Sequence, residues 1–216
     1  METGTRAPVI AIEGNIGAGK STLARYIRRH YPSCHVVDEA ESALMSAYTL
    51  SPERWGLSVQ LDLLVQRATA LRLAHARAHI NDGPIVLDRS IVGDRAFARA
   101  NWQIGRLSAI EYRIWEDAHE ELLAHIQRPD IVIYLDTPPE LAHKRAELRD
   151  ARVHALDYFA ELARAHDDAL SYVRSYGVHI VREPWDDIEP HLYDSTADRL
   201  LTRVAKLFHD TIISES

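Results

Sequence analysis

Eight residues near the start of the chain have the composition and spacing of a phosphate-binding loop. Residues 14–21 read Gly-Asn-Ile-Gly-Ala-Gly-Lys-Ser and match the pattern G-x-x-x-x-G-K-[ST]. In this pattern glycines let backbone N–H groups face the phosphates, the lysine reaches the β- and γ-phosphates, and the hydroxyl binds Mg²⁺. The sequence therefore predicts ATP with Mg²⁺, held by the loop and the next residue: Gly14, Asn15, Ile16, Gly17, Ala18, Gly19, Lys20, Ser21 and Thr22.

Such a loop works only between a buried strand and a helix whose positive N-terminal end faces the phosphates. Residues 8–13 are apolar and rich in β-branched side chains, which predicts the strand, and residues 21–30 are expected to form the helix. The alternative is a glycine-rich turn with a surface lysine. The flanking segments argue against it.

The rest of the chain alternates short apolar runs with helical patterns. Further strands are predicted at residues 35–38, 85–87, 130–135 and 178–181, and helices at 52–80, 108–126, 156–173 and 196–208. This alternation predicts an α/β fold with a five-stranded parallel sheet, helices on both faces, and ligands at the carboxyl ends of the strands. We find no repeat or linker and expect a single domain spanning residues 1–216.

Three segments carry helix-start signals. Ser51 precedes Pro52 as an N-cap before a proline at the first helical position, and Ser108 with Glu111 fits a capping box. Thr137 is expected to cap a further helix.

Composition excludes some classes of protein. A net charge of −7 argues against a nucleic-acid polymer as partner, because binding to such polymers depends on many clustered Lys and Arg side chains. The longest apolar runs are too short to cross a membrane and no signal peptide opens the chain, so we expect a soluble, cytoplasmic protein. The single cysteine, Cys34, cannot form an internal disulfide.

Several separated stretches resemble the deoxynucleoside kinase family. Residues 12–17 resemble that family's version of the P-loop, and residues 88–90, Asp-Arg-Ser, resemble its acid-Arg-Ser signature. Residues 156–158 and 166–168 are similar to the helix that follows its lid. The resemblance implies a P-loop kinase fold with a short lid, transfer of the γ-phosphoryl group of ATP to the 5′-hydroxyl of a deoxyribonucleoside in nucleotide salvage, and a homodimer.

The resemblance also implies catalytic roles. Glu39 matches the carboxylate that accepts the proton of the 5′-hydroxyl, with Asp38 as the fallback, and Arg89 matches the arginine beside the transferring phosphate. Lys20 completes the catalytic set, while Asp88 and Ser21 are the predicted metal ligands. Many family members have glutamate where Asp88 stands, so its reach to the metal can differ. Without the resemblance, Glu39 reads as a solvated acid at a strand end and Arg89 as a surface arginine.

Other positions match the family's nucleoside contacts. Gln60 matches the glutamine that pairs with the base, and Tyr48 the tyrosine that contacts the 3′-hydroxyl of the sugar. Trp55 packs in the core or forms a wall of the pocket. The aromatic residue that stacks on the base aligns with Ala98, so Phe97, one place earlier, stacks there or nothing does.

Arg67 and Asp94 match a charged pair found in cytidine- and purine-selective members. Arg67 lies two helical turns beyond Gln60 and therefore on the same helix face. We expect a preference for deoxyadenosine, deoxyguanosine or deoxycytidine over thymidine, because a 5-methylpyrimidine fills such a polar pocket poorly. The alternative is an exposed helix arginine and an unrelated loop acid.

A basic segment at residues 144–154 resembles the family's lid. Arg145 and Arg149 are expected to bind the ATP phosphates, and Asp150 to reach the sugar 3′-hydroxyl. The alternative is a mixed-charge, solvated helix face. Residues 182–185 occupy the place where the family holds adenine, and we expect only backbone contacts there.

Two other functions stay open. One is a different small-molecule P-loop kinase, such as a thymidine or nucleoside monophosphate kinase; the latter needs extra arginines for the acceptor's phosphate. The other is a non-catalytic structural relative, which would not need the complete Gly19-Lys20-Ser21.

Overall fold

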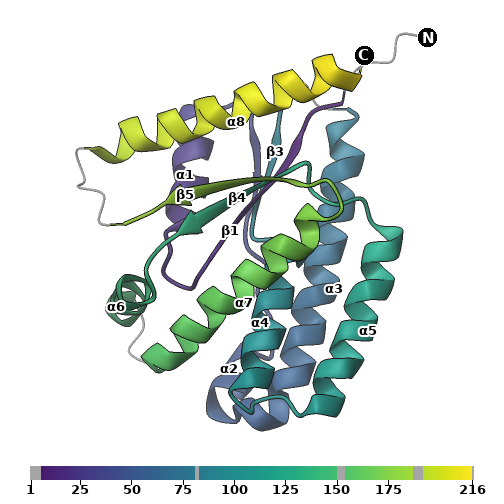
Figure 1. Ribbon diagram of the computed structural model, residues 1–216, viewed down its shortest axis with the longest axis vertical. Coiled ribbons are helices and arrows are strands. Elements are labelled where there is room, and N and C mark those ends of the chain that lie inside the picture. Colours follow the sequence, from purple (N-terminus) through teal and green to yellow (C-terminus); the bar gives the residue numbers. More distant parts are fainter. Residues whose placement is uncertain (1–5, 81–82, 150–153, 187–191, 216) are drawn as a thin grey trace.

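Five parallel strands form one sheet, as the sequence predicted (Figure 1). The strand order is β2-β3-β1-β4-β5. The computed structural model describes residues 6–80, 83–149, 154–186 and 192–215, with side chains as far as residue 207. The strands are β1 (Val9–Gly14), β2 (His35–Val37), β3 (Ile85–Asp88), β4 (Ile131–Asp136) and β5 (His179–Pro184). The helices are α1 (Lys20–His30), α2 (Met45–Leu50), α3 (Pro52–Ala78), α4 (Ile91–Gln103), α5 (Ala109–His125), α6 (Pro139–Arg149), α7 (Leu156–Arg174) and α8 (Tyr193–Glu215).

Helices cover both faces of the sheet, because successive side chains of each strand point to opposite sides. Ile10 and Ile12 of β1 pack in a cluster with side chains of α1 and α8. Val9 packs in another cluster with side chains of α3, α4 and α5, and Ala11 in a third with side chains of α4 and α7. Figure 1 shows the same layers, with α1 and α8 on one side of the sheet and α3, α4, α5 and α7 on the other.

Parallel pairing brings the strands' carboxyl ends to one edge. The register pairs Ile12 of β1 with Asp88 of β3 and Gly14 of β1 with Leu135 of β4. The phosphate-binding loop leaves β1 at this edge, and Arg89 follows β3 there. Residues far apart in sequence therefore meet above the middle of the sheet.

The observed elements differ from the predicted ones in several places. Helices α2 and α4 were not predicted from the sequence. The buried positions of α4 include Gly93, Asp94 and Asn101, so its buried face does not show the regular spacing of apolar residues that predicts a helix. The helix expected after Thr137 is present as α6, and the hydroxyl of Thr137 donates to the carbonyl of Trp185, 3.0 Å away. The capping box at the start of α5 is confirmed.

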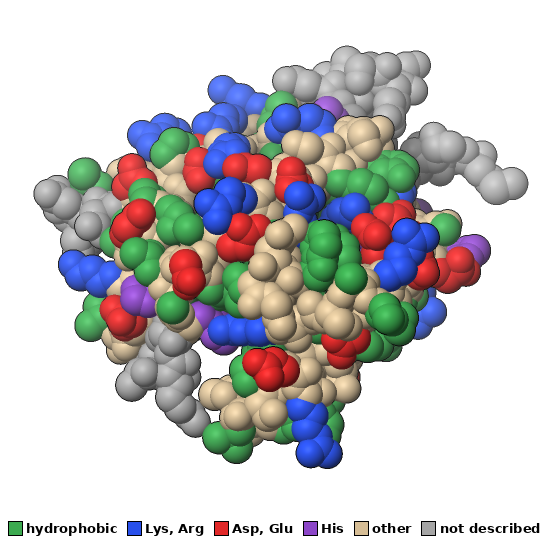
Figure 2. Space-filling view, turned by 60° about the horizontal axis from the view of Figure 1, so that its bottom comes forward, with side chains coloured by type: hydrophobic (Ala, Val, Ile, Leu, Met, Phe, Trp, Pro, Cys, Tyr) green, Lys and Arg blue, Asp and Glu red, His purple; other side chains and the backbone are tan. Residues whose placement is uncertain are grey.

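Charged side chains of both signs cover much of the surface. Figure 2 shows one face on which basic and acidic groups are interspersed. Within the described part of the chain, every helix is too short or too polar to cross a lipid bilayer.

Leu64 and Val65 on α3 allow a matched test of the core. Leu64 is fully buried and packs in the same cluster as Ile91 and Trp115, whereas its neighbour Val65 is 56% exposed. We expect Leu64→Ala to lower the free energy of unfolding by about 2–5 kcal/mol, because it leaves a cavity. Val65→Ala should change it by about 0.5 kcal/mol or less. Urea unfolding measures both, and equal losses would contradict this packing.

Candidate functional site

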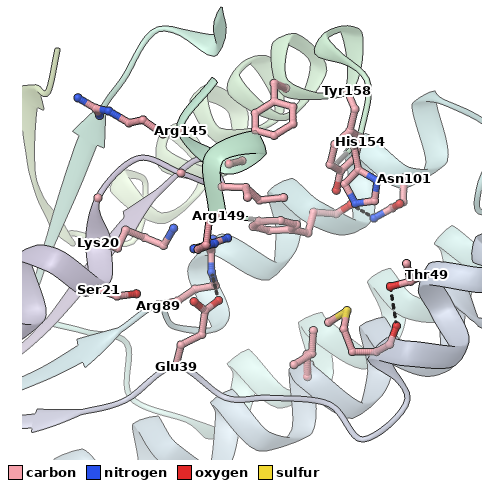
Figure 3. A pocket seen from close by; sticks show the side chains of 18 of the residues that line it. Lys20, Ser21, Glu39, Thr49, Arg89, Asn101, Arg145, Arg149, His154 and Tyr158 are labelled. Carbon is pink, nitrogen blue, oxygen red and sulfur yellow. Dashed lines mark hydrogen bonds and ion pairs between the residues drawn. The ribbon is translucent and has the colours of Figure 1, made fainter. Parts of the chain in front are cut away.

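A cavity of about 1100 Å³ opens at the carboxyl edge of the sheet. Its walls come from the phosphate-binding loop, from α2 and α3, from the end of α4, and from α6 and the start of α7. In Figure 3, Glu39 and Arg89 lie between Lys20 at one end and Asn101 and His154 at the other. The cavity therefore joins a phosphate-type site to a second compartment.

The loop is shaped for anions. Gly17 and Gly19 have φ values of 75° and 99°, which favour glycine. A Cβ at Gly17 would lie 2.3 Å from the carbonyl oxygen of Ala142 on α6. Most of the predicted loop residues line the cavity, namely Ile16, Gly17, Gly19, Lys20, Ser21 and Thr22.

Asn15 braces the loop from behind. Its side-chain amide donates to the carbonyl of Phe159, 2.9 Å away, and its Oδ1 accepts from the N–H of Ile16 at 2.8 Å. Gly14 and Ala18, which also belong to the predicted loop, are buried and do not line the cavity. The loop is thus fixed to α7 rather than held by its own turn alone.

Lys20 is buried and points back at its own loop. Its Nζ donates to the carbonyl of Asn15 at 2.8 Å. Burial, with a smaller contribution from the Arg89 cation, lowers the pKa of Lys20 to about 7. An incoming anion would favour the charged amine and restore its proton.

Arg89 and Glu39 form an ion pair in the middle of the cavity (Figure 3). Nε of Arg89 donates to Oε1 of Glu39 at 2.7 Å, and NH1 donates to the carbonyl of Gly14 at 3.3 Å. Arg89 has φ 72°, so its backbone is in the left-handed region that side chains rarely adopt. Strain of this kind persists only where neighbouring contacts hold it.

Glu39 stays ionised despite its environment. Burial alone would raise its pKa, but Arg89, Lys20 and Arg67 outweigh that effect and hold the pKa at about 2. Asp38, the fallback, instead pairs with Arg28 and its side chain is 79% exposed. Of the two carboxylates, the structure brings only Glu39 to Arg89.

Sequence reasoning missed Glu13. This fully buried carboxylate accepts from the N–H and hydroxyl of Ser90, both at 2.8 Å, and from the N–H of Gly93 at 3.2 Å. It thereby caps the start of α4 and fixes the residue after Arg89. An acid inside an otherwise apolar strand was the available signal. Burial raises the pKa of Glu13, although Arg89 opposes the change.

Arg67 and Asp94 meet in a direct ion pair, as the family match implied. Arg67 also reaches Oε1 of Glu39 at 3.2 Å, so the pair joins the Arg89 network. The Asp94 side chain is fully buried. Burial raises its pKa to about 6 even though Arg67 works in the opposite direction. The reading of these residues as an exposed arginine and an unrelated acid is wrong.

Ser21 and Asp88 suit a divalent cation bound together with phosphates. Oδ1 of Asp88 is buried and has no hydrogen-bond partner in the described part of the chain. Burial raises the pKa of Asp88, while a hydrogen bond from Ser21 works in the opposite direction. Carboxylate and hydroxyl oxygens are ligands that Mg²⁺ prefers, with phosphate oxygens completing its shell. Among the described residues no group of three or more His, Cys, Asp and Glu could hold a metal by itself.

The second compartment holds most of the predicted nucleoside contacts. Gln60 lines it, and its Oε1 is buried without a partner among the described residues. Tyr48 and Phe97 also line it, whereas Ala98 is packed in the core. Trp55 packs partly buried beside Tyr48 and is not among the described residues that form the wall.

The basic segment lies partly over the loop. Arg145 and Arg149 line the cavity, and Arg145 donates to the carbonyl of Asp186 at 2.6 Å. Asp150 lies outside the described residues, as do residues 151–153 of the predicted lid.

Several wall residues were not predicted as contacts of the site. His154 and Tyr158 lie in the predicted lid and in the helix expected after it, and Trp185 lies where only backbone contacts were expected. Asn101 and Arg106 come from the end of α4 and the turn after it, and His154 and Tyr158 from the start of α7. Trp185 and Tyr193 line the cavity after β5 and at the start of α8. These segments become neighbours only when the helices pack.

Comparisons with known proteins agree with this geometry. The family model described as "Deoxynucleoside kinase" matches residues 10–209. The chain is 27% identical over 185 residues to deoxyadenosine kinase of Dictyostelium discoideum, covering 82% of this chain and 72% of the relative. It is 28% identical over 193 residues to deoxycytidine kinase 2 of Gallus gallus, covering 74% and 73%. A solved structure of deoxyadenosine kinase from M. mycoides with bound dCTP has the same fold, with TM-score 0.75, 19% identity, and coverage of 92% of this chain and 99% of that one.

The lowered pKa of Lys20 makes ATP binding depend on pH. Because the pKa is about 7 in the free protein, Lys20 is mostly neutral at pH 8, and the triphosphate should restore its charge. We expect uptake of about one proton per ATP at pH 8, and affinity that falls by up to about tenfold per pH unit above 7.

Calorimetry in two buffers with different ionisation enthalpies measures the uptake. Lys20→Arg is the matched control, because arginine keeps its charge at this pH and should take up no proton. A wild-type enthalpy that is the same in both buffers would contradict the prediction.

Proposed function

Because this chain belongs to the deoxynucleoside kinase family, we propose that it transfers the γ-phosphoryl group of ATP to the 5′-hydroxyl of a deoxyribonucleoside. One observation carries the proposal in detail. A single cavity places a phosphate-binding loop at one end and the uncharged amide of Gln60 at the other, with the Arg89–Glu39 pair lining it as well.

The loop end suits the donor. Backbone N–H groups and Lys20 bind the phosphates, and Arg145 and Arg149 on α6 face the same cavity. Mg²⁺ held by Ser21 and Asp88 would neutralise phosphate charge. Covering cations exclude water and so favour transfer over hydrolysis.

Glu39 orients the 5′-hydroxyl and accepts its proton. A carboxylate whose pKa is about 2 is a weak base, which suits a loose transition state in which the attacking oxygen loses its proton late. Arg89 is permanently charged and lies beside Glu39, so it can stabilise the charge that develops during transfer.

The buried Arg67–Asp94 pair supports a preference for deoxyadenosine, deoxyguanosine or deoxycytidine over thymidine. Arg67 lines the cavity from the same helix as Gln60, the proposed base contact, and the ion pair with Asp94 holds its guanidinium there. A methyl group placed against such groups leaves them poorly solvated. Relatives named for deoxyadenosine and deoxycytidine support the same preference.

Assembly and location follow the family resemblance. We expect a cytoplasmic homodimer. Leu73 on α3 and Ile110 and Ile114 on α5 are exposed apolar side chains that we expect a second copy to cover.

Removing the charge of Glu39 tests the reaction. Glu39→Gln keeps the shape of the side chain but cannot accept a proton, so we expect kcat to fall by about 100-fold or more. Asp38→Asn, at the exposed neighbour, should leave kcat within about twofold. Radiolabelled ATP with each of the four deoxynucleosides is the assay. Full turnover by Glu39→Gln would remove its role as base.

Deleting the buried charge pair tests selectivity. The double variant Arg67→Met/Asp94→Ala removes both charges, because removing one alone leaves a buried charge unpaired. We expect kcat/KM for thymidine relative to deoxycytidine to rise by about tenfold.

The control is Arg99→Met/Asp168→Ala, which deletes a more exposed pair between α4 and α7. It should leave the ratio unchanged. Thymidine as the best substrate of the wild-type protein would reject the preference.

A further inference from the structure

Arg106 enters the cavity from a turn that the fold holds firmly. Gly105, with φ 80°, reverses the chain after α4, and the N–H of Arg106 donates to the carbonyl of Asn101 at 2.8 Å. A Cβ at Gly56 of α3 would lie 3.1 Å from the carbonyl oxygen of Arg106, so α3 packs against this turn. The backbone therefore fixes the direction from which the side chain reaches the cavity.

Arg106 differs from the other arginines of the nucleoside compartment in its partners. Arg67 and Arg89 are both in ion pairs with buried or half-buried carboxylates. Within the described residues Arg106 has no carboxylate partner: its guanidinium lies over the ring of Tyr158, 4.9 Å from the centroid, and NH1 donates to the hydroxyl of Tyr48 at 3.4 Å. A guanidinium has five N–H groups, so most of those of Arg106 are available to a ligand.

The hydroxyl proton of Tyr48 is already in a hydrogen bond and cannot be donated to a ligand. Its hydroxyl donates to Oδ1 of Asn101 at 2.8 Å while it accepts from Arg106. The phenol oxygen has two lone pairs, so one remains free to accept. His154 lies beside Tyr158 with ring centroids 4.5 Å apart. Burial, followed by repulsion from Arg106, lowers the pKa of His154 to about 4, so this side chain adds no second cation near neutral pH.

Tyr48 and Arg106 together offer the hydrogen-bond acceptor and the donor that one hydroxyl group needs. One free lone pair on Tyr48 can accept a hydrogen bond, and free N–H groups on Arg106 can donate, at adjacent positions. A carbonyl would leave the lone pair unused and an ammonium group would leave the guanidinium unused, whereas a hydroxyl both donates and accepts. A deoxyribonucleoside has two hydroxyls, and the 5′-hydroxyl is required at Glu39.

We propose that Arg106 is a substrate-binding residue that donates to the 3′-hydroxyl of the acceptor, and that it sets the enzyme's discrimination between deoxy- and dideoxynucleosides. This rests on the proposed function. The contact between Arg106 and Tyr48 is long at 3.4 Å, so the guanidinium can turn to the sugar with little loss.

Comparing a deoxynucleoside with its 2′,3′-dideoxy form isolates this contact. Arg106→Met keeps an unbranched side chain over Tyr158 but removes the N–H donors. We expect kcat/KM for the deoxynucleoside to fall by about 10-fold to 100-fold, mostly through KM. For the dideoxynucleoside the fall should be about threefold or less, and the KM of ATP should not change. Arg106→Lys should give an intermediate loss, because it keeps the charge as a single point donor.

Arg113→Met is the matched control, since that arginine on α5 is 72% exposed and pairs with Asp117. Thermal unfolding of each variant shows whether the fold is intact. Equal losses for both nucleosides, or no loss for either, would overturn the role of Arg106. A wild-type protein that phosphorylates none of the deoxynucleosides would instead overturn the proposed function.

Discussion

One buried cation, Arg89, joins the parts of the site. Its guanidinium contacts Glu39, the carbonyl of Gly14 and, at 3.9 Å, Glu13, and it lies 4.4 Å from the centroid of the Phe97 ring. A buried cation is stable only when its charge and its N–H groups are satisfied. The phosphate loop, the candidate base and the nucleoside wall are therefore held in one arrangement because all of them satisfy the same group.

The strained backbone of Arg89 is supported by the buried carboxylate of Glu13, which binds the next residue, Ser90. Glu13 accepts three hydrogen bonds, two from Ser90, which is the N-cap of α4, and one from the N–H of Gly93. A Cβ at Gly93 would lie 2.3 Å from Oε2 of Glu13, so glycine leaves room for this carboxylate. Helix α4 then carries Asn101 to the cavity wall and the buried Asp94 to Arg67, which lines the cavity. The same strand that leads into the phosphate loop thus also positions the residues of the nucleoside end.

The sequence predicted those features that depend on local patterns. The parallel sheet, the loop at residues 14–21 and the capping box of α5 each have a periodic or spaced signal within a short window. Helix α4 was not predicted, because its buried positions include polar residues that serve the site. Arg106 and Asn101 carried no signal either, since their place in the cavity wall depends on the packing of α3, α4 and α7. The family resemblance drew attention to Arg67 and Asp94, but only the fold shows that their charges meet inside the protein.

Gly17 of the phosphate-binding loop packs directly against Ala142 of α6, a helix that is distant in sequence. Because a hypothetical Cβ at Gly17 would reach within 2.3 Å of a carbonyl oxygen of α6, the loop and that helix touch backbone to backbone. Displacing α6, which carries Arg145 and Arg149, must therefore change the support beneath the loop at the same time. The position of the α6 arginines and the shape of the loop that receives the donor are therefore coupled through one backbone contact.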